Sequence, residues 1–216
     1  MRPFWKRGAG QPAGQSNDPV PSREIIRHFN AAAADEEHFP STIDPRIYHV
    51  QVIRQHLGDI NGARILDVGS GKGRFARVLH GEFPASRICA FDLAEAMLRF
   101  VPEGIAPCAG SMTALPFASS QFDGAYATES LEHAVDIETA VNEMCRVVKP
   151  GGRIVIIDKN AEHWGRLRTP EWEKWFHRNE LERQLKRHCS LVTSQPISYW
   201  EDVAPDGLFL VWLATK

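Results

Sequence analysis

The chain has 216 residues, of which 43% are hydrophobic and 24% are charged, and its formal net charge is −2. This length suits one globular domain with a core large enough to fold without disulfides or a structural metal. The lack of a basic excess argues against a nucleic-acid partner. The longest apolar run, residues 208–214, is too short to span a membrane.

The cysteines lie far apart in the sequence and show neither a CxxC pair nor the spacing of a zinc site: Cys89, Cys108, Cys145 and Cys189. We therefore expect reduced thiols and a cytoplasmic protein. Arg2, Lys6 and Arg7 are not followed by an apolar stretch, so no secretory signal is expected.

Residues 1–21 contain three glycines and four prolines with almost no apolar periodicity, which predicts a flexible tail. The domain is expected to start at Ser22, the N-cap of a first helix. A second helix is predicted from Asp44 as its cap and Pro45 in its first turn, with Gly58 as its stop.

Strands and helices alternate from residue 63 onward. Short apolar runs predict strands at residues 63–68, 87–91, 105–109, 122–128, 153–157, 191–200 and 208–214. Helical periodicity is found at residues 74–80, at 94–101, between Asp136 and Pro150, and in a mixed form at 164–188. This alternation predicts an α/β domain with a mostly parallel sheet, helices on both faces, and an antiparallel pair at the end.

A glycine-rich loop, residues 67–73, directly follows the first predicted strand. Glycines there let the backbone turn sharply and approach a ligand closely. A P-loop would need glycine where the chain has Leu66 and serine or threonine where it has Gly73, so that site is excluded. Arg74 stands where a dinucleotide fingerprint needs a small residue, which weakens that interpretation without excluding it.

Asp92 ends the second predicted strand. A carboxylate at this place can accept hydrogen bonds from both hydroxyls of a ribose, in NAD or in S-adenosylmethionine. The alternative is a plain N-cap for the helix at residues 94–101. Because a glycine loop precedes it, we favour ribose binding.

Four motifs follow one another in the chain: ILDVGSGKG (65–73), FDLAEAML (91–98), LPFASSQFD (115–123) and RVVKPGGRIVI (146–156). In this order and spacing they resemble a class I S-adenosylmethionine-dependent methyltransferase of the type 11 kind. The resemblance implies a Rossmann-like, doubly wound, mostly parallel seven-stranded sheet with an antiparallel last strand. It also implies lid helices at 22–62, a cofactor-binding core at 63–158, and substrate-side helices with terminal strands at 159–216.

The resemblance further implies which residues meet the cofactor: Asp67, Gly69, Ser70, Gly71, Gly73, Asp92, Leu93, Met97, Ser111, Met112 and Glu129. The glycine loop and Asp67 would hold the methionine part, Asp92 the ribose, and Leu93 and Met97 the adenine. The family commonly has an acidic residue near the adenine amino group. Here Ser111, or the backbone of the next residue, is expected to replace it.

Glu129, Glu132 and His133 follow the fourth predicted strand, and helical or turn geometry would bring them to one side. His133 could be a general base whose tautomer a carboxylate fixes. The three residues could instead ligate a divalent metal such as Mg²⁺, with His163 as a fourth ligand. They could also be only a polar cap, with Glu129 near the cofactor. E-x-x-E-H is similar to the motif of ubiquinone-pathway O-methyltransferases and small-RNA 2′-O-methyltransferases, where metal ligation is implied.

The predicted function is methyl transfer from S-adenosylmethionine to an oxygen or nitrogen of a small-molecule acceptor, with His133 and Glu132 as catalytic candidates. The Trp-, Arg- and His-rich segment 163–176 is a candidate acceptor wall, although helical spacing favours packing of Trp172, Trp175 and Phe176 on the sheet and leaves only Trp164, Arg166 and Arg168 open. The N-terminal helices with Phe29 and Phe39 are the candidate lid. RNA 2′-O-methylation and a non-catalytic methyltransferase-like binding protein are the alternatives. The missing basic surface argues against RNA.

Overall fold

The computed structural model describes residues 22–216, so the predicted tail at residues 1–21 lies outside the described part of the chain. The strands are β1 (Arg64–Val68), β2 (Arg87–Asp92), β3 (Ala106–Ala109), β4 (Phe122–Thr128), β5 (Val148–Lys159), β6 (Leu191–Ile197) and β7 (Phe209–Thr215). The α-helices are α1 (Ser22–Ala32), α2 (Tyr48–Leu57), α3 (Arg74–Glu82), α4 (Glu95–Leu98), α5 (Ile137–Val147) and α6 (Arg178–Leu185). Short 3₁₀ turns occur at η1 (Leu131–His133) and η2 (Ala161–His163).

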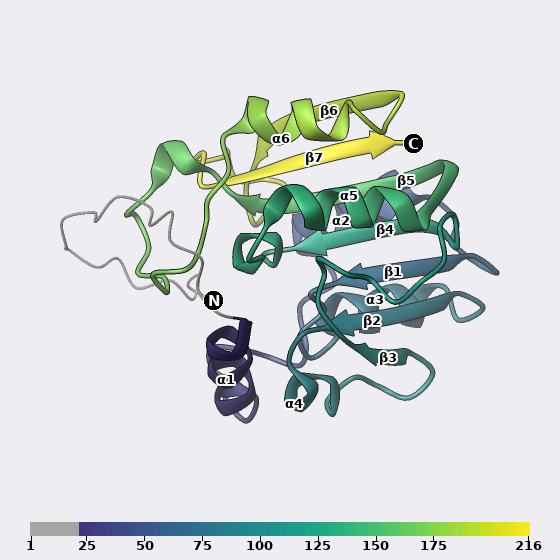
Figure 1. Ribbon diagram of the computed structural model, residues 1–216, viewed down its shortest axis with the longest axis horizontal. Coiled ribbons are helices and arrows are strands. Elements are labelled where there is room, and N and C mark those ends of the chain that lie inside the picture. Colours follow the sequence, from purple (N-terminus) through teal and green to yellow (C-terminus); the bar gives the residue numbers. More distant parts are fainter. Residues whose placement is uncertain (1–21) are drawn as a thin grey trace.

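The strands of the described region form one seven-stranded sheet in the order β3-β2-β1-β4-β5-β7-β6 (Figure 1). β1 to β5 pair in parallel, and β7 lies antiparallel between β5 and β6. The strand order reverses between β1 and β4, and open α/β sheets bind ligands beside such a point. The predicted Rossmann-like fold with its antiparallel last strand is therefore confirmed.

Two apolar cores cover the two faces of the sheet. Met144 of α5 and Leu181 of α6 belong to one core, and Ile53 of α2 and Leu79 of α3 belong to the other. Figure 1 shows α5 in front of the sheet and α2 and α3 behind it. Because the central strands are buried on both faces, their sequences are nearly continuous apolar runs, and only their ends can carry polar groups into a site.

The second helix begins later than predicted. α2 starts at Tyr48, because the Asp44 carboxylate pairs with the Arg46 guanidinium (Nη2 to Oδ2 2.6 Å) rather than capping a helix at residue 45. The helix ends as predicted at Gly58, whose φ of +72° is the left-handed conformation that glycine adopts most easily.

The predicted mixed helix at residues 164–188 is mostly wrong. Only α6 is helical there, and the segment before it is an irregular loop that Gly165 (φ +87°) and Pro170 interrupt. The hydrophobic side chains of Trp175 and Phe176 are buried against the domain (3% and 5% exposed). Burial of these rings, rather than helix propensity, holds the loop in place.

β5 is longer than the predicted strand at residues 153–157. It continues through Asp158 and Lys159, which pair with Leu210 and Phe209 of β7. The antiparallel partner extends the strand past the last apolar residue, a long-range effect that a local apolar pattern does not record. As a result, two charged residues lie at its carboxyl end.

The cysteines are free thiols in the structure, with Cys145 and Cys189 buried and the other two half-buried. Among residues 22–216, the structure contains no helix with the length and apolar character needed to cross a membrane.

Candidate functional site

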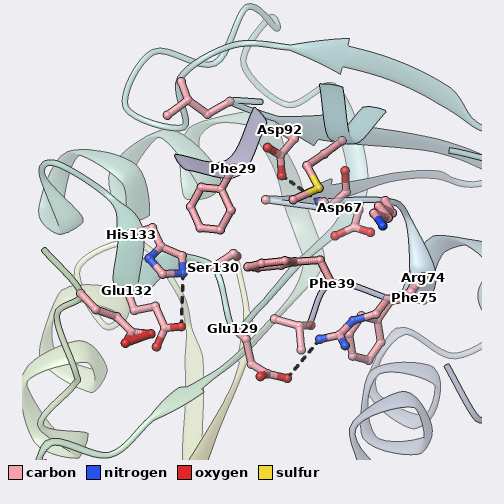
Figure 2. Close-up of a pocket in the computed structure, with 18 of the residues that line it drawn as sticks. Phe29, Phe39, Asp67, Arg74, Phe75, Asp92, Glu129, Ser130, Glu132 and His133 are labelled. Atoms are coloured by element: carbon pink, nitrogen blue, oxygen red, sulfur yellow. Dashed lines mark hydrogen bonds and ion pairs between the residues drawn. The ribbon is translucent and has the colours of Figure 1, made fainter. Parts of the chain in front are cut away.

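A pocket of about 780 Å³ opens at the carboxyl ends of the parallel strands. The loops after β1, β2, β4 and β5 form its floor and walls, and residues of α1 and the segment that follows α1 line its other side. Figure 2 shows Asp67 and Asp92 at one end of this space, Glu132 and His133 at another, and the rings of Phe29 and Phe39 between them.

The glycine loop lies close to the turn that follows β4. Gly69 has a φ of +73°, and a Cβ on it would meet the Ser130 Cβ at 2.4 Å, so a larger residue does not fit. The Ser130 hydroxyl donates a hydrogen bond to the carbonyl of Val68 (2.7 Å) and thereby joins the two loops. Only glycine at position 69 permits this close approach.

Asp67 is buried at the end of β1 and accepts a hydrogen bond from the Tyr126 hydroxyl (2.9 Å). Burial, opposed by the Tyr126 hydrogen bond and assisted by the nearby Asp92 charge, raises the pKa of Asp67 to about 8. Near neutral pH this carboxyl is therefore mostly protonated in the ligand-free pocket. A cation placed beside it would favour its ionised form.

Asp92 organises the backbone on both sides of the pocket floor. One carboxylate oxygen accepts from the Gly71 N–H (2.7 Å) and the other from the Ala94 N–H (2.8 Å). The capping role is thus present in the structure, and each oxygen keeps further lone pairs that a ligand hydroxyl can use. Burial raises the pKa of Asp92 above its usual value.

All but one of the residues predicted for cofactor contact line this pocket, and so do His133 and Glu132. The exception is Gly73, which lies at the start of α3 with a left-handed φ of +74° and does not line the cavity. Ser111 lines the pocket and its hydroxyl bonds to that of Thr113 (2.7 Å). The roles assigned to these residues remain predictions.

Two buried hydroxyls of the pocket lining, those of Ser70 and Thr128, have no hydrogen-bond partner among the described residues. A buried polar group without a partner costs free energy, so these hydroxyls mark where a polar ligand would be stabilised. These hydroxyls, the tight glycine loop at Gly69 and the Asp92 carboxylate together fit a ligand that combines a nucleoside with an amino acid.

The segment after α1 is tied to the glycine loop. The Lys72 ammonium donates to the Glu36 carboxylate (2.7 Å) and to the Asp35 carbonyl (3.1 Å), and its side chain is buried. On the inner side, Phe29 packs against Phe39 with ring centroids 5.8 Å apart. This segment therefore lines the pocket and is held against the glycine loop, and its role as a lid remains a prediction.

Glu129 does not join Glu132 and His133, contrary to the predicted grouping. Its φ of +51° turns the chain, and its carboxylate contacts the Arg74 guanidinium (3.4 Å) and lies 3.9 Å from His49 Nδ1. Figure 2 shows Glu129 and Glu132 pointing to different partners. The left-handed residue breaks the local spacing on which the prediction depended.

Glu132 and His133 belong instead to a cluster with Lys159 and Glu173. Lys159 Nζ contacts Glu132 Oε1 and lies 2.7 Å from Glu173 Oε1. His133 Nε2 is 3.5 Å from the same Glu132 oxygen (Figure 2). The Asp158 carboxylate accepts from the Glu132 backbone N–H (3.2 Å) and completes the group.

The charges in this cluster separate the roles of its members. Burial and the Asp158 charge raise the pKa of Glu132 well above its usual range, while the Lys159 ammonium acts in the opposite direction. Burial lowers the pKa of His133 to about 4, which leaves its imidazole neutral. Burial would raise the pKa of Glu173, but the Lys159 ammonium outweighs it and lowers that pKa to about 2. His133 therefore has an unprotonated imidazole at neutral pH, which a general base requires.

The two ring nitrogens of His133 have different surroundings. Nδ1 is enclosed and has no hydrogen-bond partner in the described part of the chain, whereas Nε2 faces Glu132 Oε1. The imidazole packs edge-on against Phe29 (centroids 4.9 Å apart), which holds the ring in place.

The predicted metal set does not fit the structure. Glu129 is engaged by Arg74, and His163 faces the Arg166 guanidinium (3.2 Å). Glu132, His133 and Glu173 do place ligand atoms within 4.8 Å of one another, but the Lys159 ammonium already contacts both carboxylates. We derive no metal-dependent step from this arrangement.

Sequence reasoning missed Lys159, Asp158 and Glu173. The first two lie at the end of β5, and Glu173 lies in the loop predicted to be a helix. The available signal was the pair of charges directly after a buried β-branched strand, since the carboxyl ends of parallel strands carry the site.

A second buried histidine, His49, is expected to make the folding stability depend on pH. His49 of α2 is fully buried, neither ring nitrogen has a hydrogen-bond partner among the described residues, and burial lowers its pKa to about 4. The unfolded chain takes up the proton near pH 6.5 and the folded chain only near pH 4, so stability falls as pH falls through this window. Between pH 7 and pH 4.5 the free energy of unfolding should fall by about 2–3 kcal/mol less in His49→Phe than in wild type. Urea unfolding at both pH values measures this difference.

Phenylalanine suits this position because His49 packs against the rings of Tyr199 and Phe209. His188→Ala, at an exposed histidine, is the control and should leave the pH dependence unchanged. If His49→Phe and wild type lose stability equally on acidification, His49 is not the source.

Comparisons with known proteins agree with this geometry. Residues 66–156 match a family described as a methyltransferase domain. The chain is 36% identical over 106 residues to malonyl-[acyl-carrier protein] O-methyltransferase of Methylococcus capsulatus, covering 46% of this chain and 38% of that protein. The chain carries a class I S-adenosylmethionine-dependent methyltransferase domain.

Other relatives of the methyltransferase domain have names that indicate different acceptors. Over 157 residues it is 30% identical to demethylmenaquinone methyltransferase of Mycolicibacterium paratuberculosis, covering 70% of this chain and 63% of the relative. Its fold matches the 1,6-didemethyltoxoflavin-N1-methyltransferase of Burkholderia thailandensis, solved with S-adenosylhomocysteine bound. The TM-score is 0.69 at 22% identity, covering 95% of this chain and 93% of that one. The chain spans less than two-thirds of the length of either of these curated relatives.

Proposed function

We propose that this chain binds S-adenosylmethionine in the pocket and transfers the methyl group to an oxygen or nitrogen atom of a small-molecule acceptor. The observation that carries the proposal is one pocket with two chemically different ends. The glycine loop with Asp67 and Asp92 forms one end, and a neutral histidine, His133, forms the other. We propose the same division of the chain as above: lid at 22–62, cofactor-binding core at 63–158 and acceptor side at 159–216.

The cofactor, when bound, supplies a methyl group on a positively charged sulfur. The residues of this chain supply binding and alignment. Asp67 and the backbone of the glycine loop meet the amino-acid part, Asp92 accepts from the ribose hydroxyls, and Leu93 and Met97 pack on the base. Holding both reactants in line contributes effective molarities of about 10⁵–10⁸ M.

His133 is proposed to accept the proton of the acceptor. It is neutral at pH 7, and the aromatic ring of Phe29 and the enclosed Nδ1 fix its orientation. Glu132 is proposed to position the imidazole, because its Oε1 lies 3.5 Å from His133 Nε2 and is held on its other side by the Lys159 ammonium. The relatives include O-methyltransferases and C-methyltransferases, and one structural neighbour is an N1-methyltransferase; a neutral imidazole at the acceptor end supports the choice of an oxygen or nitrogen acceptor.

The acceptor is proposed to enter among aromatic side chains. His28 packs against the rings of Phe29 and Trp172, with ring centroids 5.1 Å apart in each case. Arg168 and Trp200 also line the pocket. Such a wall suits a small, planar acceptor with a polar edge, because aromatic faces bind planar molecules and few polar groups orient them.

A titration with S-adenosylhomocysteine tests the proposal. The ammonium of the ligand beside Asp67 would lower the pKa of that carboxyl from about 8, so binding at pH 7 should release close to one proton. Affinity should then rise by up to about tenfold per pH unit as pH increases toward 8, and level off above it. Calorimetry at pH 7 in two buffers of different ionisation enthalpy counts the released proton.

The variant Asp67→Asn keeps the shape of the side chain and should bind without releasing this proton. NAD⁺ serves as the competing ligand and should show no binding. Binding of NAD⁺ without binding of S-adenosylhomocysteine would replace the proposal by a dinucleotide site, and binding of neither would leave a non-catalytic scaffold.

A further inference from the structure

The acceptor end of the pocket contains a buried ammonium group enclosed by acidic side chains. Lys159 is 2% exposed and lies at the end of β5. Its Nζ contacts Glu132 Oε1, lies 2.7 Å from Glu173 Oε1, and stands 6.0 Å from the centroid of the Trp175 ring. We call Glu132, His133 and Glu173 the acidic cluster.

The acidic cluster has the composition of a divalent-cation site. Two carboxylates and an imidazole place ligand atoms within 4.8 Å of one another, and hard divalent cations prefer such oxygen-rich sets. A cation bound there would have to share the Glu132 and Glu173 oxygens with an ammonium already in contact with both. The cation and the ammonium would then contact the same carboxylate oxygens, and two positive charges so close together repel strongly in a buried site.

We infer that Lys159 supplies, from within the chain, the positive charge that a divalent metal ion would otherwise supply to the acidic cluster. Lys159 is then a positioning residue, because it holds Glu132 and Glu173 while His133 faces the acceptor. It follows that the acceptor end functions without a metal, and that the acceptor brings an O–H or N–H group acidic enough for a neutral imidazole to deprotonate.

The inference deepens the proposed function and rests on it for the acceptor, but metal binding is measured without turnover. The test variant is Lys159→Met, which keeps the length and apolar stem of the side chain and removes its charge. Mn²⁺ is the probe, since its free aqueous form gives a paramagnetic resonance signal that binding removes. We expect Lys159→Met to bind Mn²⁺ at least about tenfold more tightly than wild type, because the carboxylates lose their internal cation.

Thermal unfolding gives a second readout. Loss of the ammonium leaves buried acids without their partner, so the melting temperature of Lys159→Met should fall by about 10 °C. Added Mn²⁺ should restore part of this loss in Lys159→Met and leave wild type unchanged. The matched control is Lys174→Met, since the Lys174 ammonium donates to the Val135 carbonyl (3.0 Å) and touches none of the cluster carboxylates.

Wild type is also compared with Glu173→Gln, which keeps the inference testable if Lys159→Met does not fold. Equal, weak Mn²⁺ binding by these two proteins supports the inference. It is overturned if wild type binds Mn²⁺ and Glu173→Gln abolishes that binding, or if folded Lys159→Met binds no more Mn²⁺ than wild type. S-adenosylhomocysteine is titrated into the same samples, so that a failure of the proposed function is seen separately.

Discussion

Replacing Asp92 with alanine is expected to weaken S-adenosylhomocysteine binding by at least about a hundredfold, measured by calorimetric titration. Two ribose hydroxyls would lose a charged acceptor, and hydrogen bonds to charged groups contribute about 1.5–3 kcal/mol each. The loss is expected to exceed that of a surface carboxylate because Asp92 is enclosed in the pocket and also holds the Gly71 N–H. Asp92→Asn should lie between wild type and alanine.

The control variant for Asp92→Ala must remove a carboxylate that accepts a backbone hydrogen bond but does not line the pocket. Asp123→Ala does so, because the Asp123 carboxylate accepts from the Arg64 N–H (2.8 Å) at the opposite end of β1. Melting temperatures of both variants report any loss of structure. Equal affinity in Asp92→Ala and Asp123→Ala would show that Asp92 acts only as a cap, the alternative left open by the sequence.

Replacing His133 with alanine is expected to lower kcat by about 10²–10⁴-fold while the affinity for S-adenosylhomocysteine changes less than threefold, about the size expected for loss of a general base. The substrate for this assay comes from a screen of small planar hydroxylated and amino compounds. Because the base acts when unprotonated and burial lowers its pKa to about 4, wild-type kcat should be flat from pH 6 to 8. It should fall only as pH drops through about 4.

His28→Ala is the matched control, since His28 lines the same pocket and packs on the same Phe29 ring. We expect this change to raise KM more than it lowers kcat, as loss of a binding contact does. A midpoint near pH 6.5 in the wild-type kcat profile, or an unchanged kcat in His133→Ala, would remove His133 from the role of base.

The sheet could be predicted from the sequence because its signals are local. β-branched runs mark the strands, and the helix predicted to begin at Asp136 is α5, whose N-cap Asp136 accepts from the Thr139 N–H (3.0 Å). The cofactor end was equally accessible, since the glycine loop and Asp92 each follow a strand directly. In both cases a short stretch of chain contains the residues that act together.

The acceptor end could not be predicted in the same way. Glu132, Lys159 and Glu173 meet across 41 residues of sequence, and no periodicity links them. Glu129 and Glu132 are close in sequence, but the prediction that they lie together was wrong. Glu129 has a positive φ, which the spacing of residues in a sequence does not reveal. Packing of the irregular loop against β7 decides this end of the pocket, and such packing depends on the whole fold.

The hydrogen bond from Ser130 to Val68 has a consequence for selectivity. It joins turns that leave β1 and β4, which are neighbouring strands paired by backbone hydrogen bonds. If the proposed cofactor end and acceptor end are correct, the distance between them depends on main-chain spacing, about 4.8 Å per strand, and not on the side chains proposed to contact the acceptor. Exchange of those side chains would then change which molecule enters without moving the two ends apart.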